Sequence, residues 1–447
     1  MAIIMEPPAM AMATKHPVSV PDRTRQARTG FGTLRVAMVL ASGAVALIVT
    51  LAATSAQVSG RSNPQVALRM WPFAAGAASR LAEARLVSET GSQAIHATRD
   101  IATRALLREP INVVAARVAG LTAGLEGNEK RGRRLLNYAE SLSRRDIPTQ
   151  VALIEVAVAD SNIVRALHHY DTALRTDDVA DQLLMPTLVA ASSASDVAGP
   201  LARIIVKRPP WRMRFLYGLL TTNPWPSTLI PLVTAARLNI NDALERDFLN
   251  RTVAGLVARG KLTEGAQFYA RATGTPLRAM TGAVRNGDFA GEDRIAPFDW
   301  SIVDEPGLAG IKDLVDPAVL QRASLRNALS LSIEPGRSGV VARQLLLLPA
   351  GRHTLQFTAG NVDSSDRSSI TLVCNGTDAP IAAVRFPVSS DRPKTVSANI
   401  NVPDGCSGQW IAIQAATDIN ASANQGTQPW VSGVKVLQTR VVSEGRS

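Results

Sequence analysis

The sequence of 447 residues contains few of the side chains that usually carry catalysis, metal binding or cross-linking. It has two cysteines, both near the C-terminus, and five histidines, none at a metal-ligand spacing from Cys, Asp or Glu. A disulfide scaffold is excluded, and we predict no metal and no other cofactor. Nucleophile elbows, phosphate loops and dinucleotide-binding fingerprints are also missing. These absences argue against the common classes of enzyme.

One long apolar run is present near the N-terminus. Residues 36–60 lie between Arg35 and Arg61 and contain no charged side chain. About 20 apolar residues suffice to cross a bilayer as a helix. Basic residues outnumber acids before the run, so the positive-inside rule places the N-terminus in the cytoplasm. We predict a disordered cytoplasmic tail over 1–35, a transmembrane anchor over 36–60 and export of the remaining chain.

Two other interpretations of this run stay open. A secretory signal also has a basic front and an apolar middle, and Thr54-Ser55-Ala56 would serve as its cleavage site. The alternative of a buried helix in a soluble core would need amphipathic partners nearby. The long basic segment and the length of the apolar run favour an uncleaved anchor.

Residues 62–275 show helical periodicity broken by Pro and Gly. Ala105, Ala139 and Ala173 recur at intervals of 34 residues, which is the length of a tetratricopeptide repeat. Small residues at such positions let neighbouring helices approach closely, so we predict a repeat domain of four to six helix pairs. A plain helical bundle is the alternative.

The formal net charge of +11 suggests an acidic partner or an anionic membrane surface. Export makes nucleic acid an unlikely partner, and we predict none. In stacked repeats, equivalent loops fall on one edge, so the basic runs of this region predict a positive strip; a solvated face without a partner is the alternative. The runs comprise Lys130, Arg131, Arg133, Arg134, Arg144, Arg145, Lys207, Arg208, Arg212 and Arg214.

Over residues 283–440, short β-branched segments alternate with turn-forming clusters, which is typical of an all-β sandwich. About eight strands are predicted; the approximate ranges are a segment near Phe289, 340–348, 353–359, 369–374, 384–388, 395–402, 409–415 and 430–437. Cys374 ends one predicted strand and Cys406 precedes another. In an oxidising space, we predict that these two cysteines form a disulfide.

Three motifs make this region resemble a galactose-binding-like jelly roll of the carbohydrate-binding-module kind. They are Asn286-Gly287-Asp288-Phe289 followed by Pro297-Phe298-Asp299-Trp300, a strand–Pro-x-Gly–strand hairpin over 344–355, and a closing strand over 430–434. The family often has an acid in that closing strand, at a structural calcium site. Ser432 or Gly433 stands there instead, which leaves the calcium site without its acid.

The repeats followed by the sandwich resemble anchored repeat proteins found with bacterial exopolysaccharide assembly systems. The stretches that carry this resemblance are 142–146 (LSRRD), 168–175 (HHYDTALR) and 297–300 (PFDW). The resemblance implies a single-pass protein of the bacterial inner membrane, mostly periplasmic, that acts as a non-enzymatic scaffold for envelope or exopolysaccharide assembly or export. Its implied partners are periplasmic or membrane proteins of that assembly. An acidic polysaccharide or anionic headgroups would suit the positive strip. A polysaccharide hydrolase or lyase, and a purely structural envelope protein, are the rival hypotheses.

Candidate site residues follow from these hypotheses. Tryptophan rings stack on sugars through their apolar faces. Trp410 and Trp430 lie in predicted strands where core burial is favoured, whereas for Trp300 core and ligand roles stay equally open. A hydrolase would need a carboxylate pair from Asp288, Asp299, Asp304 and Glu305, although loop acids are more often turn formers. The ligand-binding candidates are Trp300, Asp299, Arg131, Arg133, Arg134, Arg144 and Arg145.

Overall fold

The computed structural model describes residues 46–55, 58, 62–89, 91–176, 178–280, 284–312, 314–389, 392–418 and 428–438. Of the predicted anchor, residues 46–55 and 58 are described, and they are helical. The rest of the anchor and the predicted tail over 1–35 lie outside the described residues. Within the described part of the chain, no helix combines the length and the apolar character needed to span a bilayer.

The chain forms two compact units, which divide between Asn162 and Ile163. The named helices of the first unit are α2 (Pro64–Met70), α3 (Ala75–Ser88), α4 (Ser92–Arg108), α5 (Val113–Leu125), α6 (Glu129–Leu142) and α7 (Ile147–Ala159). Helix α3 packs against α4 and α5, α5 packs against α6, and α6 packs against α7. Ala105 and Ala139, two of the small residues predicted to recur, are fully buried near the ends of α4 and α6.

Two glycines set the close approach of α5 and α6. A Cβ atom at Gly132 would lie 2.9 Å from the carbonyl oxygen of Gly120, and one at Gly120 would lie 3.1 Å from that of Gly132. Both distances are shorter than ordinary van der Waals contacts. The backbones of the two helices therefore touch here, with Leu136 filling the adjacent space.

Side-chain caps define where helices of the first unit begin. Asn112 accepts a hydrogen bond from the backbone N–H of Ala115 at the start of α5, and Asp146 accepts one from that of Thr149 at the start of α7. Each cap satisfies an N–H group that the helix itself leaves unpaired. The same Asp146 carboxylate lies 2.9 Å from Nε of the buried Arg117 side chain, so the cap also anchors an interhelical ion pair.

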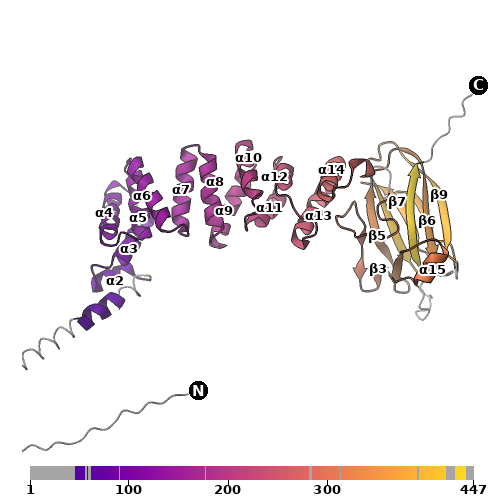
Figure 1. Ribbon diagram of the computed structural model, residues 1–447, viewed down its shortest axis with the longest axis horizontal. Helices are drawn as coiled ribbons and strands as arrows, with labels where there is room; N and C mark the ends of the chain where they lie inside the picture. Colours follow the sequence, from indigo (N-terminus) through magenta and orange to yellow (C-terminus); the bar gives the residue numbers. More distant parts are fainter. Residues whose placement is uncertain are drawn as a thin grey trace, which may run out of the picture. The chain divides into compact units, whose positions relative to one another are not determined.

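The second unit contains the remaining helices and all the strands described. Its helices are α8 (Ile163–Leu174), α9 (Asp178–Ala191), α10 (Ser195–Ile205), α11 (Arg212–Thr221), α12 (Leu229–Ala235), α13 (Ala243–Ala258) and α14 (Leu262–Thr273), followed by the 3-10 turn η1 (Leu277–Met280). From α8 to α11, each helix packs against the helix two positions further along the chain. One row contains α8, α10 and α12, and the other contains α9, α11 and α13. Figure 1 shows these helices following one another toward the sheets. Such two-row stacking is typical of helical repeats.

Two antiparallel sheets form a β-sandwich in the second unit. One sheet has the order β1-β5-β10-β7-β8, and the other has the order β2-β3-β4-β11-β6-β9. The strands are β1 (Ser301–Ile302), β2 (Asp304–Glu305), β3 (Leu308–Lys312), β4 (Leu329–Ile333), β5 (Ser338–Leu346), β6 (Gly351–Gly360), β7 (Ser369–Cys374), β8 (Pro380–Arg385), β9 (Lys394–Val402), β10 (Gln409–Ala416) and β11 (Trp430–Gln438). A short helix, α15 (Pro317–Arg322), precedes β4.

The core between the sheets has alternating inward-facing residues. On β10, Ile411 and Ile413 point inward and meet Phe357 of β6 within one apolar cluster. The strand predicted near Phe289 is wrong, because Phe289 follows a turn with φ +58° and buries its ring against Trp300. The short strands β1 to β4, by contrast, were not predicted.

The helices and the sandwich of the second unit are joined by a buried polar contact. The Tyr269 hydroxyl of α14 donates to Oδ1 of Asp299 at 2.6 Å, and Oδ2 of Asp299 accepts from the backbone N–H groups of Arg294 and Ile295. Burial, and then the hydrogen bond to Asp299, raise the pKa of Tyr269. The phenol therefore remains a hydrogen-bond donor at neutral pH.

An arginine reinforces this joint. The Arg285 Nε donates to the carbonyl oxygen of Phe298 at 2.7 Å and lies 3.9 Å from the Asp299 carboxylate. Burial lowers the pKa of Arg285, while Asp299 favours its charged form. The Phe298 ring packs on Tyr269 at a centroid distance of 5.5 Å. The Pro-Phe-Asp-Trp motif is thus the place where α14 docks on the sandwich.

The glycine contact in the first unit can be tested with a matched pair. Gly132→Ala should lower the free energy of unfolding by about 1–3 kcal/mol, because its Cβ would overlap the α5 backbone. Gly124→Ala, on α5 with open space around its Cβ, should stabilise by about 0.5–1 kcal/mol through helix propensity. Urea unfolding of the full-length variants, followed by circular dichroism, measures both. A stabilising Gly132→Ala would contradict the close approach.

The docking contact predicts a pH dependence. The pKa of Tyr269 in the folded protein is raised above its unfolded value of about 10. The contribution of this phenol to the free energy of unfolding is therefore complete below about pH 10 and is lost as the pH rises above 10. Tyr269→Phe should cost about 1–3 kcal/mol at pH 7, because one Asp299 oxygen loses its donor. The variant should also lose less stability than the wild type between pH 9 and 11.

Tyr217→Phe is the control for this prediction. Tyr217 donates to Asp247 at 2.8 Å in a similar way, but the Asp247 side chain is 48% exposed and water replaces the lost donor. If Tyr217→Phe lowered the free energy of unfolding as much as Tyr269→Phe does, burial of the hydrogen bond would not explain the effect of Tyr269→Phe.

Candidate functional site

A groove of about 610 Å³ lies between α13 and the outward face of the five-stranded sheet, inside the second unit. Figure 1 shows α13 and α14 beside the sheet that contains β5. The groove is lined by small and apolar side chains together with two arginines, two asparagines, a serine and a tryptophan. The lining residues are Asn250, Arg251, Ala254, Val257, Ala258, Gly260, Ala296, Pro297, Ser301, Arg343, Asn375, Gly376 and Trp410.

One face of α13 forms the helical wall of the groove. Asn250, Ala254 and Ala258 are spaced by four residues, so they line up along the helix. The Asn250 Oδ1 accepts a hydrogen bond from the backbone N–H of Ala296 at 2.8 Å. This bond holds the segment before Phe298 against α13.

Trp410 forms the aromatic part of the sheet wall. It lies on β10 opposite Leu345 of β5 and Val373 of β7, and its ring is partly exposed on the outward face. Its indole Nε1 donates to Oδ1 of Asn375 at 3.0 Å. The Arg343 guanidinium carbon lies 5.1 Å from the centroid of the Trp410 ring. The ring is therefore fixed at its edge and has a cation next to its face.

The disulfide between Cys374 and Cys406 borders this wall and joins the two cysteines that the sequence predicts to pair. Asn375 follows Cys374 directly, and its backbone N–H donates to the carbonyl oxygen of Gly408 at 2.8 Å. The Gln409 Nε2 donates to the carbonyl oxygen of Cys406 at 2.7 Å. Covalent and hydrogen-bonded links thus fix the loop that positions the Asn375 side chain.

The charged side chains that line the groove are Arg251 and Arg343, and the lining contains no Asp or Glu. The Arg251 Nε donates to Oδ2 of Asp247 at 2.7 Å, and this hydrogen bond raises the pKa of Arg251. Both guanidinium groups are positively charged at neutral pH. The groove thus combines an aromatic ring, amide groups and cations, which suits binding of a polar ligand.

Two predicted ligand residues, Trp300 and Asp299, do not reach an open surface. Trp300 is 3% exposed, donates from Nε1 to the carbonyl oxygen of Asn286 at 3.1 Å and packs on Phe289. Asp299 is 8% exposed and is occupied by Tyr269 and backbone N–H groups. Both side chains are buried and make hydrogen bonds within the fold, so neither lines the groove.

Trp410 was missed as a site residue because core burial was favoured for it. The alternation of β10 contains the signal that would have found it: Ile411, Ile413 and Ala415 occupy the core face, so Trp410 faces outward. The α13 wall has no comparable local signal. Trp430, at the start of β11, is fully buried as predicted.

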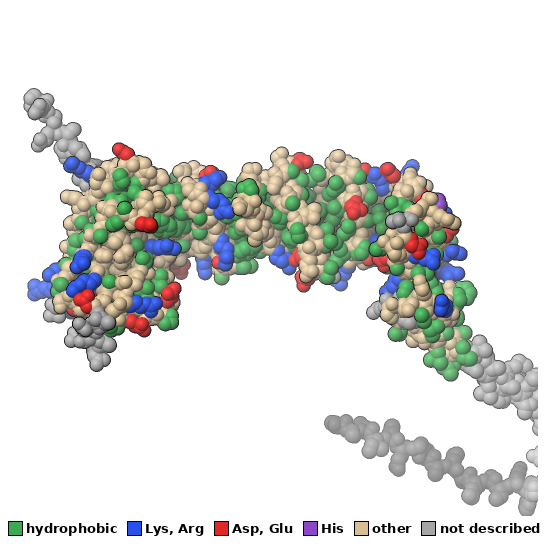
Figure 2. Space-filling model, turned by 180° about the vertical axis from the view of Figure 1, so that it is seen from behind, with side chains coloured by type: hydrophobic (Ala, Val, Ile, Leu, Met, Phe, Trp, Pro, Cys, Tyr) green, Lys and Arg blue, Asp and Glu red, His purple; other side chains and the backbone are tan. Residues whose placement is uncertain are grey.

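The predicted basic strip is divided by ion pairs. Arg133 Nη2 lies 2.7 Å from Asp160, and the hydrogen bond to Asp160 raises the pKa of Arg133. In the second unit, Arg212 is buried with Glu245, and Arg214 pairs with Asp181. On the face in Figure 2, blue and red side chains adjoin over the helices. The exposed candidates without a carboxylate partner among the described residues are Arg131, Arg134, Arg144 and Arg145.

The other carboxylates proposed for hydrolysis do not line the groove. Asp304 and Glu305 are exposed on β2, and Asp288 accepts a hydrogen bond from the backbone N–H of Ala290 in a turn. Among the described residues, no group of His, Cys, Asp and Glu is arranged to hold a metal ion. The Ser432 hydroxyl donates to the carbonyl oxygen of Asn327 at 2.6 Å.

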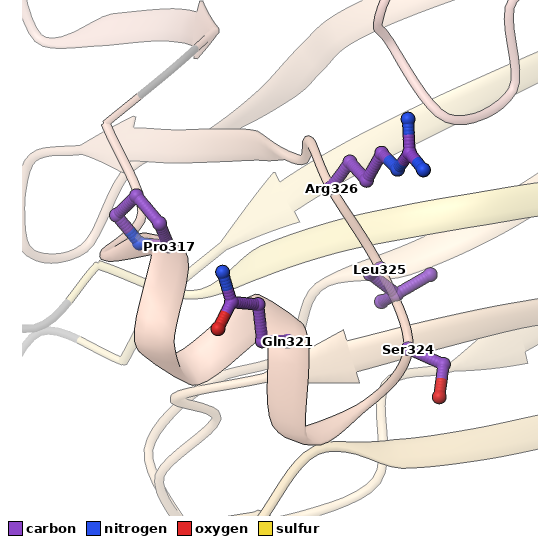
Figure 3. Close-up of a pocket in the computed structure, with 5 residues that line it drawn as sticks. All are labelled: Pro317, Gln321, Ser324, Leu325 and Arg326. Carbon is purple, nitrogen blue, oxygen red and sulfur yellow. The ribbon is translucent and has the colours of Figure 1, made fainter.

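A second hollow of about 410 Å³ lies beside α15. Figure 3 shows Pro317 and Gln321 on the helix and Ser324, Leu325 and Arg326 on the segment that follows, with the Arg326 side chain extending away from the helix. This hollow has no aromatic lining and no second cation. The groove along α13 is therefore the better candidate for a binding site.

No protein-family model matches the chain, and no curated protein gives a significant sequence match. Similar solved structures include a carbohydrate-binding module, CBM4 (13% identity, TM-score 0.24, covering 35% of this chain and 99% of that one). A protein assigned as sugar-binding from Bacteroides thetaiotaomicron has 11% identity and a TM-score of 0.27, over 35% of this chain and all of that one. The enzymatically active domain of tailspike protein 4 from bacteriophage CBA120 has 16% identity and a TM-score of 0.26, and the match spans 35% of this chain but only 21% of the tailspike.

Proposed function

We propose that the protein is a non-enzymatic scaffold that binds glycan in the groove beside α13 and serves assembly or export of an envelope polysaccharide. The observation that carries this proposal is the groove itself, in which Trp410 is fixed by Asn375 beside Arg343. Aromatic faces pack against the apolar faces of sugar rings, while amide and guanidinium groups bind hydroxyl groups. The same lining has no carboxylate pair for glycoside hydrolysis.

The finer parts of the proposal concern the other regions. We take the helical hairpins as tetratricopeptide-like units that bind protein partners of the assembly, and the sandwich as a jelly roll of the carbohydrate-binding kind. Residues 36–60 would anchor the chain in a bacterial inner membrane with the bulk in the periplasm. Stacked helix pairs support this role, since such repeats offer extended binding surfaces.

A hydrolase or lyase is the second candidate, and one measurement separates it from the scaffold. We expect the full-length protein to bind polysaccharides on a glycan array without releasing reducing ends from them. Release of oligosaccharides by the pure protein would favour the enzyme, and failure to bind any saccharide would end the proposal.

Trp410→Ala should weaken glycan binding about tenfold or more while leaving the fold intact, because the ring supplies the apolar contact area. Trp225→Ala is the control: Trp225 is also partly exposed and has a guanidinium, that of Arg259, 3.8 Å from its ring centroid, but it does not line the groove. Calorimetric titration of both folded variants measures the effect. Equal losses would place the glycan elsewhere.

The topology can be checked independently of binding. A phosphatase fused after residue 447 should be active in the periplasm, whereas one fused within residues 1–30 should be inactive, because the basic residues before the apolar run are retained in the cytoplasm. Cytoplasmic retention of the C-terminal fusion would contradict the anchored, exported arrangement.

A further inference from the structure

We infer that the ligand of the groove is a carboxylated saccharide, such as a polymer of hexuronic acid units, and that Arg343 binds its carboxylate. The inference rests on the proposed function, because it specifies which sugars the groove accepts. Its basis is the distribution of charge among the described residues of the second unit.

Several guanidinium groups near the groove and on the helices leading to it have carboxylate partners. Arg208 and Arg212 pair with Glu245, and Arg214 pairs with Asp181. Arg251, at the groove, pairs with Asp247. Arg343 differs: among the residues that the structure describes, its recorded partner is the Trp410 ring and no carboxylate forms a salt bridge with it.

The position of Arg343 favours an anionic ligand. It lies on β5 opposite Ala412 of β10, so its long side chain extends along the outward face past a small neighbour. The contact with the Trp410 ring limits the orientations of the guanidinium without using its N–H groups. A planar guanidinium held in this way can donate two parallel hydrogen bonds to a carboxylate.

The shape of the groove favours a sugar over a bulkier anion. Its volume of about 610 Å³ is in the range of small-molecule sites, about 300–1,000 Å³. Ala254, Ala258 and Gly260 leave room along α13 for a chain that passes through. A hexuronic acid has an apolar ring face for Trp410 and a carboxylate on the same ring for Arg343. Neutral sugars satisfy the first contact and leave Arg343 without a counterion.

The test uses two probes with the same sugar rings, one with free carboxylates and one with those carboxylates esterified. Oligogalacturonate and its methyl ester have the same rings, but the ester has no carboxylate. Titrated into the full-length protein at low salt, the acid should bind about tenfold more tightly than the ester, and the difference should shrink as salt is added. Arg343→Gln should remove most of this preference while the ester still binds.

Arg385→Gln is the matched control, since Arg385 is exposed on β8 of the same sheet and does not line the groove. It should leave the preference for the acid unchanged. Equal binding of acid and ester, or an Arg343→Gln variant that retains the preference, would overturn the inference but not glycan binding. Absence of binding by both probes and by every other saccharide would overturn both proposals. Equally tight binding of polyglutamate would show that the groove recognises acidic chains in general rather than a carboxylated sugar.

Discussion

The hydrogen bond between Tyr269 and Asp299 is the contact on which the candidate site depends. It fixes α14 to the sandwich, and because α14 packs against α13, it also places the wall that contains Asn250 and Ala254. The bond is buried and is supported by Arg285, so its electrostatic strength is little reduced by water. If the sandwich were joined to the helices only by the segment after Thr273, the outward face of the five-stranded sheet would have no opposing wall and Trp410 would lie on an open surface.

The sequence predicts the local elements well where a periodic signal is strong. The recurrence of Ala105 and Ala139 identifies positions that are fully buried between helices, and predicted strands such as 369–374 and 409–415 agree with β7 and β10. The strands β1 and β2 have two residues each, too short for alternation to be recognised. A periodic pattern shows which face of a helix or strand is buried. The pattern can be recognised only when the element is longer than two or three residues.

The candidate site was much less predictable, and the reason is physical. Asp299 and Trp300 stand in a turn, and no local pattern shows whether a turn residue faces solvent or a neighbouring element. For Asp299 the answer depends on Tyr269, 30 residues earlier in the chain, and for Trp300 it depends on Phe289. The groove likewise combines α13 with Arg343 and Trp410, more than 80 residues later, and which helix covers a sheet is decided by packing over the whole unit. Only the outward direction of Trp410 was available from sequence.

From the composition alone, the high net charge suggests an acidic partner, whereas in the fold some of the arginines bind carboxylates of the same chain. Many arginines join helices: Arg117 is 4% exposed and reaches Glu83 and Asp146 from two other helices. Buried pairs of this kind favour one arrangement of helices over others, and their net contribution to stability is small. An excess of positive charge is thus compatible with many of the described arginines having carboxylate partners.

The link between Cys374 and Cys406 makes the order of the groove depend on the oxidation state of these two thiols. The loop that holds Asn375, and through it the indole of Trp410, is closed covalently only after these thiols are oxidised. A newly made chain in a reducing compartment has the same residues but a looser loop, whose ordering would cost binding energy. The order of the groove is therefore tied to the redox state of the surroundings, and a reductant that opens this link would loosen the groove without altering any residue that lines it.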